Sequence, residues 1–123
     1  MTKTIIVVDD SQTARRQVCL ALAEEGYEIV EAVDGVDGLA KIAAHADASL
    51  IICDVNMPNM NGIQMLQALR ADHPSVQVPI IMLTTEALPA LLNQAKQAGA
   101  KGWIVKPFAT NMLVSAVRKL ASG

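Results

Sequence analysis

The chain has 123 residues, of which 52% are hydrophobic and only 2% aromatic, and its formal net charge is −2. This length fits one domain, and the apolar content is too high for a disordered chain. Binding to nucleic-acid phosphates needs a basic patch, and the sequence has no run of Lys or Arg. Nucleic-acid binding is therefore not expected.

The sequence also argues against secretion and membrane insertion. The apolar run near the N-terminus is too short for a signal peptide, and no apolar segment approaches the length of a membrane-spanning helix. The two cysteines, Cys19 and Cys53, lack the spacing of a zinc or redox motif. We expect both to be buried as small hydrophobes in a reducing compartment. A cytoplasmic protein is predicted.

Short apolar runs alternate with helical patterns along the chain. Residues 5–8 form the first run, and apolar residues at helical spacing follow in 14–22. Segment 27–32 alternates polar and apolar residues, which predicts a half-exposed edge strand. Asp34 can then cap a helix that begins near Gly35.

The second half of the chain repeats this alternation. Residues 50–53 and 80–83 are continuous apolar runs, which predict strands covered on both faces, and run 103–105 is interpreted in the same way. Helical spacing of apolar residues recurs in 91–98 and 112–120. Five strand–helix repeats predict a parallel α/β sheet with helices on both faces, joined by right-handed crossovers.

The ends of the predicted strands carry reactive groups. In a parallel α/β sheet the ligand site lies beyond the carboxyl ends of the strands. A single acid there needs no explanation, but three clustered acids repel one another strongly unless a cation lies among them, and Mg2+ prefers such oxygen ligands. The groups are Asp9 and Asp10 after the first strand, Asp54 after the third, Thr84 and Thr85 after the fourth, and Lys106 and Pro107 after the fifth.

The chemistry of these groups predicts a phosphoryl acceptor. The first loop has two acids and no glycine, so it suits a cation rather than the phosphates of a nucleotide. A carboxylate beside Mg2+ can attack a phosphoryl group and become an aspartyl phosphate. Lys106 would neutralise charge on the transferred oxygens, and Thr84 could donate a hydrogen bond to one of them and act as a switch. Arg15 and Arg16, which follow the first loop, are expected to be solvated helix residues.

Four segments of the sequence carry a family resemblance. VVDD, CDVNMPNMNG, MLTTEA and GAKGWIVKPF match, in order and spacing, the signatures of the receiver domains of bacterial two-component response regulators. The chain most resembles the single-domain chemotaxis type (CheY-like), over nearly its whole length. The resemblance implies one receiver domain over residues 1–123 with a flavodoxin-like (βα)5 fold. This is a three-layer α/β sandwich whose five-stranded parallel sheet has the order 2-1-3-4-5, as is known for that family.

The resemblance also assigns roles to the acids. Asp54 resembles the phosphoacceptor, which explains why an apolar run ends in a carboxylate. Asp10 and Asp54 resemble the side-chain ligands of Mg2+, and the backbone carbonyl of Asn56 resembles a third ligand. Asp9 resembles a group that assists through water.

The remaining motif positions concern phosphate contact and lifetime. Thr84 resembles the switch hydroxyl and Lys106 the phosphate-contacting amine, and the bond to Pro107 is often cis in the family. Asn56 and Glu86 lie at two positions that tune the rate of phosphoryl loss in the family. The Asn/Glu pair resembles the fast chemotaxis type, which implies a short-lived signal.

The resemblance implies partners as well. The phosphodonor would be a sensor histidine kinase, and a downstream protein target would bind the face of helix 4, strand 5 and helix 5. Trp103 stands where the family usually has a Tyr or Phe ring that moves on activation, and a moving and a static Trp103 both remain open. We expect a monomer or, once phosphorylated, a weak dimer, with a role in chemotaxis or motility.

Three alternatives remain open from the sequence. One is a Mg2+-dependent phosphatase of the haloacid dehalogenase type, but its second acid would fall at Asn56, which cannot shuttle a proton. Another is a receiver-like interaction module that takes no phosphate. The third is an excised receiver of a larger regulator.

Overall fold

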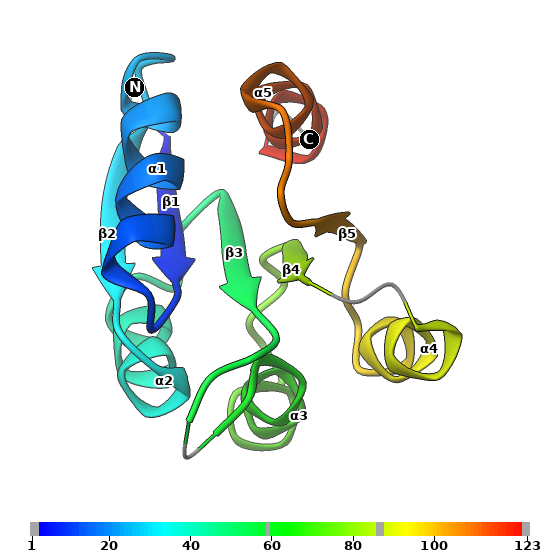
Figure 1. Cartoon of the computed structure of the whole chain (residues 1–123). Helices are drawn as coiled ribbons and strands as arrows, with labels where there is room; N and C mark the ends of the chain where they lie inside the picture. The colour runs from blue at the N-terminus through cyan, green and yellow to red at the C-terminus, as the bar shows by residue number, and fades with distance from the viewer. Residues whose placement is uncertain (1–2, 59, 86–87, 122–123) are drawn as a thin grey trace.

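The computed structural model describes residues 3–58, 60–85 and 88–121. Within these residues the strands form one parallel sheet in the order β2-β1-β3-β4-β5. Helices α1 and α5 cover one face of the sheet, and α2, α3 and α4 cover the other, which confirms the predicted three-layer sandwich (Figure 1). The strands are β1 (Thr4–Val8), β2 (Glu28–Ala32), β3 (Leu50–Asp54), β4 (Ile80–Thr84) and β5 (Gly102–Val105); the helices are α1 (Gln12–Ala23), α2 (Gly35–Ala44), α3 (Gly62–Asp72), α4 (Pro89–Gln97) and α5 (Thr110–Ala121).

The strands at the centre of the sheet divide the apolar core into two parts. Every residue of β3 and β4 is buried, as their continuous apolar runs predicted. Alternate side chains point to opposite faces, so that Ile51 packs in the core under α2, α3 and α4, whereas Ile52 packs in the core under α1 and α5. This double burial fixes the register of the central strands.

β2 and β5 form the two edges of the sheet, and the sequence predicted the exposure of β2 correctly but not that of β5. β2 is an edge strand, as its alternating pattern indicated. The prediction that run 103–105 is covered on both faces is wrong, because β5 is the other edge and only Ile104 is buried. Trp103 is 40% exposed and Val105 is 42% exposed. Burial of a strand depends on the elements that flank it, and the apolar composition of β5 does not reveal that no strand follows it in the sheet.

Local signals set several helix boundaries. The side chain of Asp34 accepts a hydrogen bond from the backbone N–H of Asp37 at 2.8 Å and caps α2, as predicted. Pro89 occupies the first turn of α4, where its missing N–H costs nothing. Gly99, after α4, has a φ of +104°, a left-handed conformation that favours glycine. None of the helices in the described part of the chain is both long and apolar enough to cross a membrane.

Candidate functional site

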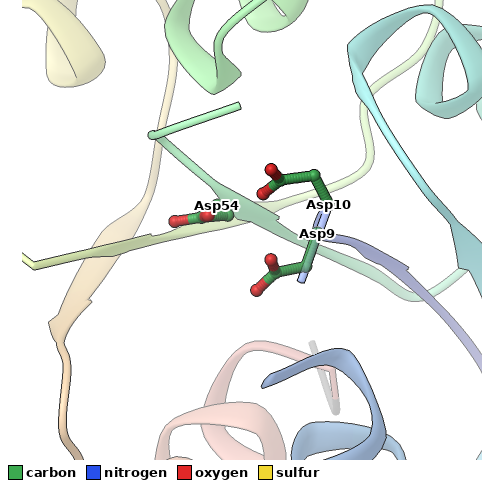
Figure 2. Close-up of side chains that lie close together, drawn as sticks. All are labelled: Asp9, Asp10 and Asp54. Atoms are coloured by element: carbon green, nitrogen blue, oxygen red, sulfur yellow. The ribbon is translucent and has the colours of Figure 1, made fainter. Parts of the chain in front are cut away.

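Three carboxylates meet at the carboxyl end of the sheet. β1 and β3 are neighbours, and their register pairs Val8 with Cys53, so the next residues, Asp9 and Asp54, end side by side. Asp10 follows in the β1–α1 loop, and carboxylate oxygens of all three acids lie within 4.8 Å of one another (Figure 2). Asp9 and Asp54 are buried and Asp10 is exposed. The tertiary structure therefore brings together the three acids that the sequence predicted to lie at this edge of the sheet.

A glycine lets the backbone turn tightly behind Asp54. Gly62 begins α3, and its N–H donates a hydrogen bond to the carbonyl oxygen of Val55 at 3.0 Å. A Cβ atom at Gly62 would lie 2.3 Å from the carbonyl oxygen of Asp54, closer than any side chain can approach. The close contact between α3 and the end of β3 thus requires glycine and fixes the backbone on which Asp54 stands.

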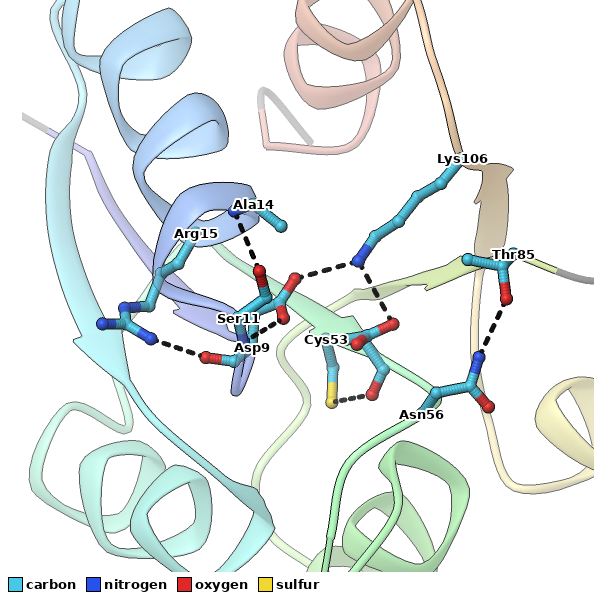
Figure 3. Close-up of polar contacts among 9 residues, drawn as sticks. Asp9, Ser11, Ala14, Arg15, Cys53, Asn56, Thr85 and Lys106 are labelled. Carbon is cyan, nitrogen blue, oxygen red and sulfur yellow. Dashed lines mark hydrogen bonds and ion pairs between the residues drawn. The ribbon is translucent and has the colours of Figure 1, made fainter.

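Lys106 reaches the acids from the end of β5. Its Nζ lies 3.1 Å from Asp9 Oδ2 and 3.4 Å from Asp54 Oδ1 (Figure 3). The backbone N–H of Lys106 donates to the carbonyl oxygen of Thr84 at 2.7 Å, and the bond to Pro107 is cis. One ammonium is thus shared between two buried carboxylates.

Asp54 is held in an environment that disfavours its charge. Burial, followed by the negative charge of Asp9, raises the pKa of Asp54, and the ammonium of Lys106 opposes these effects. Asp54 Oδ1 is buried, and although it lies 3.4 Å from Lys106 Nζ in an ion pair, it has no contact of hydrogen-bond geometry among the described residues. A buried carboxylate oxygen with one long ion pair can take a further positive partner.

The donor set fits a hard divalent cation. Asp9 is already engaged, since its Oδ1 accepts a hydrogen bond from the N–H of Ser11 at 2.9 Å and its Oδ2 pairs with Lys106. Asp10 is exposed, and Asp54 Oδ1 has the ion pair with Lys106 at 3.4 Å but no hydrogen bond from a described residue. Carboxylate oxygens with access to water are the ligands that Mg2+ prefers. Asp10 and Asp54 are therefore better placed than Asp9 to contact an ion directly.

The hydroxyl groups that follow β4 lie beside the same edge of the sheet. Thr84 is fully buried at the last position of β4. Thr85 is exposed, and its Oγ1 accepts a hydrogen bond from Asn56 Nδ2 at 3.1 Å (Figure 3). The sequence did not predict this contact, which joins the β3–α3 and β4–α4 loops. Glu86 lies outside the described residues.

The expectation that Arg15 is solvated is wrong. The side chain of Arg15 is only 13% exposed, and its guanidinium binds the Glu31 carboxylate and the backbone carbonyl of Asp9. The neighbouring Arg16 is exposed, as expected. No local sequence signal separates the two arginines, because the partners of Arg15 come from other elements.

The face formed by α4, β5 and α5 carries exposed apolar side chains. β5 lies between the two helices (Figure 1). Leu88 before α4 is 54% exposed and Met112 in α5 is 61% exposed. Together with Trp103 and Val105 on β5, these residues place exposed large apolar side chains on β5, on α5 and directly before α4.

Comparison with known proteins agrees with this architecture. Residues 5–118 match the model of the response regulator receiver domain family. The chain is 44% identical to the chemotaxis protein CheY1 of Helicobacter pylori strain J99 over 89% of each chain. The structure resembles CheY4 of Vibrio cholerae, a chemotaxis protein, with a TM-score of 0.90, 38% identity and coverage of 98% of this chain and 99% of the other.

A further solved structure is the CheX–CheY–BeF3–Mg2+ complex of Borrelia burgdorferi, which matches with a TM-score of 0.88 and 26% identity over 95% of this chain and 87% of that one. The family model covers most of the sequence, and a relative well above 30% identity covers nearly all of it. The chain therefore belongs to the response regulator receiver domain family and is a CheY-like receiver.

Proposed function

We propose that the protein is a phosphorylated signalling switch that accepts a phosphoryl group on Asp54 from the phosphohistidine of a sensor histidine kinase. One observation carries the proposal. The carboxylate of Asp54, 4% exposed, ends a buried strand beside two other acids and 3.4 Å from Lys106 Nζ. Such a concentration of opposed charges is expensive to bury for structural reasons alone, and it suits a site that neutralises a transferred phosphoryl group.

The same acids would hold Mg2+. Asp10 and Asp54 are proposed as direct ligands, with the backbone carbonyl of Asn56 as a third and Asp9 assisting through water. When bound, the ion supplies positive charge that stabilises the oxygens of the phosphoryl group in transfer. The lack of a hydrogen bond to Asp54 Oδ1 from the described residues and the exposure of Asp10 support this assignment.

The chain's own residues then have separate tasks. A carboxylate oxygen of Asp54 forms a bond to phosphorus while the bond from phosphorus to the donor's imidazole nitrogen breaks, and the electron pair of that bond returns to the nitrogen. Lys106 neutralises a phosphoryl oxygen, and Thr84 donates its hydroxyl hydrogen to another. Water later hydrolyses the acyl phosphate at a rate that Asn56 and Glu86 tune. The protein is thus a phosphoacceptor that assists its own reactions, not an enzyme with an external product.

The output is proposed to be a change in the face of α4, β5 and α5. Movement of Thr84 towards the phosphoryl group would shift the β4–α4 loop and the surroundings of Trp103, and a downstream protein target would bind the altered face. The similarity to chemotaxis proteins favours a role in chemotaxis or motility. We further propose that residues 1–123 form one receiver domain, which acts as a monomer, or as a weak dimer once phosphorylated, in the cytoplasm, where ATP-dependent kinases act.

The test is the intact mass of the protein after incubation with phosphoramidate and Mg2+ and rapid quenching. One phosphoryl adduct is expected on the parent chain, and none is expected without Mg2+ or in Asp54→Asn. If no adduct forms, and beryllofluoride with Mg2+ leaves the fluorescence of Trp103 unchanged as well, the chain is an interaction module that takes no phosphate. Catalytic turnover of a generic phosphomonoester would favour a phosphatase, although the amide of Asn56 argues against it.

A further inference from the structure

Two adjacent arginines of α1 have different surroundings. The chain reads Ala14-Arg15-Arg16, and both arginines follow the loop that bears Asp9 and Asp10. The side chain of Arg15 is 13% exposed, whereas Arg16 is an exposed residue. Burial of a guanidinium is costly unless its donors are satisfied, so the partners of Arg15 indicate what it does.

The guanidinium of Arg15 joins β2 to the loop after β1. Its Nε donates to Glu31 Oε1 at 2.9 Å, and its Nη1 donates to the backbone carbonyl oxygen of Asp9 at 2.8 Å (Figure 3 shows the second bond). The backbone N–H of Arg15 donates to the carbonyl oxygen of Ser11 at 2.9 Å, which ties the start of α1 to the same loop. Both side-chain bonds involve an ionised donor and are stronger than bonds between neutral groups.

These contacts fix the peptide unit between the two acids. The N–H of Asp9 donates to the carbonyl oxygen of Ala32 at 3.1 Å, and its carbonyl oxygen is held by Arg15, so the backbone is fixed on both sides of this residue. A peptide unit is planar, and the carbonyl of Asp9 therefore sets the direction in which the backbone of Asp10 leaves. Asp10 is exposed, and its carboxylate lies within 4.8 Å of those of Asp9 and Asp54, so a change in the direction of its backbone would move the carboxylate relative to theirs.

We infer that Arg15, held by Glu31, is a positioning residue for the three-carboxylate site, acting on Asp10 through the carbonyl of Asp9. The inference rests on the proposed function, because the site that Arg15 orders is the one proposed to bind Mg2+. The role is geometric and not electrostatic. A positive charge near an acidic site weakens its attraction for a cation, so the two roles predict opposite effects when the charge is removed.

The test compares Mg2+ dissociation constants, measured by calorimetry, for the parent chain, Arg15→Met and Arg16→Met. Positioning predicts that Arg15→Met binds Mg2+ about tenfold more weakly, as for other residues that orient metal ligands. Arg16→Met removes the same charge from the exposed side of the helix and is expected to bind as tightly as the parent chain or slightly more tightly. Equal or tighter binding by Arg15→Met would overturn the inference. Failure of the parent chain to bind Mg2+ would instead overturn the proposed function.

Arg15→Lys separates geometry from charge. It keeps the net charge but loses the planar fork that reaches Glu31 and Asp9 together, so weakened Mg2+ binding is again expected. Binding equal to that of the parent chain would contradict positioning. Denaturant unfolding in the absence of metal identifies variants that fail to fold, and for these the comparison moves to Glu31→Gln, with Glu28→Gln on the same strand as its control. Glu31→Gln is expected to weaken Mg2+ binding and Glu28→Gln to leave it unchanged, and equal binding by the two overturns the inference.

A double-mutant cycle tests whether the effect passes through Asp10. Asp10→Asn is expected to weaken Mg2+ binding by itself, because it removes a proposed ligand. If Arg15 acts by orienting this carboxylate, adding Arg15→Met to Asp10→Asn causes little further loss. A further tenfold loss in the double variant would show that Arg15 acts by another route and would reject the inference.

Discussion

The ammonium of Lys106 lies 3.1 Å from the carboxylate of Asp9, although 97 residues separate them in the chain. The contact spans the sheet edge from the end of β5 to the end of β1, and the same ammonium lies 3.4 Å from Asp54. Lys106 is 18% exposed, so the pair is shielded from the solvent that weakens surface ion pairs. The charge of Lys106 makes two buried carboxylates tolerable in the absence of a cation.

Removal of Lys106 should destabilise the metal-free protein. Lys106→Met leaves Asp9 and Asp54 without their shared counter-charge, and we expect a loss of about 3 kcal/mol, the lower end of the range for a broken buried ion pair. Urea unfolding at pH 7 measures this loss. Lys101→Met, at an exposed site before β5, removes the same charge and should change the free energy of unfolding by less than about 0.5 kcal/mol. Equal effects of the two variants would contradict the pairing.

Asp54→Asn should stabilise the metal-free protein at neutral pH. The pKa of Asp54 is raised from its ordinary 3.8 by burial and by the charge of Asp9. The folded state therefore binds this proton more tightly than the unfolded chain, and the stability it contributes is present in acid and lost as the pH rises from 3.8 through the folded pKa. We expect a gain of about 1 kcal/mol or more in Asp54→Asn at pH 7, on the order of one relieved charge repulsion.

The increase in the free energy of unfolding that Asp54→Asn gives over the parent chain should become smaller towards pH 4, because Asp54 is increasingly protonated in the parent chain there. Mg2+ should reduce the advantage of the variant at pH 7. At ten times its dissociation constant the ion stabilises the parent chain by about 1.4 kcal/mol, and the variant gains less. Thermal unfolding at several pH values, with and without Mg2+, measures both effects. A variant that is less stable than the parent at pH 7 without metal would refute this view of Asp54.

Gly62 should not tolerate a side chain. Gly62→Ala places a Cβ atom 2.3 Å from the carbonyl oxygen of Asp54, and the backbone must shift to relieve it. We expect a loss of about 2–3 kcal/mol, as for overpacking at a rigid site. Gly102→Ala is the matched control, because no atom lies within 4 Å of the Cβ position there. Denaturant unfolding of the two variants should separate them clearly, and a similar small effect in both would argue against the tight turn behind Asp54.

Cys19 should be a slow nucleophile. Burial, followed by the negative charge of Glu31, raises the pKa of its thiol to about 11. The rate of alkylation by iodoacetamide should therefore keep rising up to about pH 11, since only the thiolate reacts. Glu31→Gln should move the midpoint of this rise to lower pH, whereas Glu28→Gln should not. Cys53 is fully buried, so Cys19→Ser should abolish the reaction in the folded protein. Cys19 is only partly buried, so the prediction that both cysteines are buried is correct for Cys53 alone. A midpoint near that of a free thiol would contradict even this partial burial of Cys19.

Local patterns in the amino-acid sequence predicted the buried strands and the residues at their ends. Continuous apolar runs marked the buried strands β1, β3 and β4 because both faces of a central parallel strand are covered by helices. The acids and Lys106 were visible because polar residues at strand ends interrupt those runs. Parallel strands carry their carboxyl ends to one edge, which made the meeting of Asp9, Asp10 and Asp54 predictable.

The packing of strands and helices sets which side chains are covered and which residues cover them. β5 is as apolar as a central strand, yet Trp103 and Val105 are exposed because they point to the face opposite Ile104, where the helix layer covers this edge of the sheet incompletely. Arg15 and Arg16 are adjacent residues of the same type, but only Arg15 is largely covered, and its partner Glu31 lies 16 residues further along the chain. Burial and pairing are properties of elements packed together, and local sequence patterns do not contain the identity of a residue's distant neighbours.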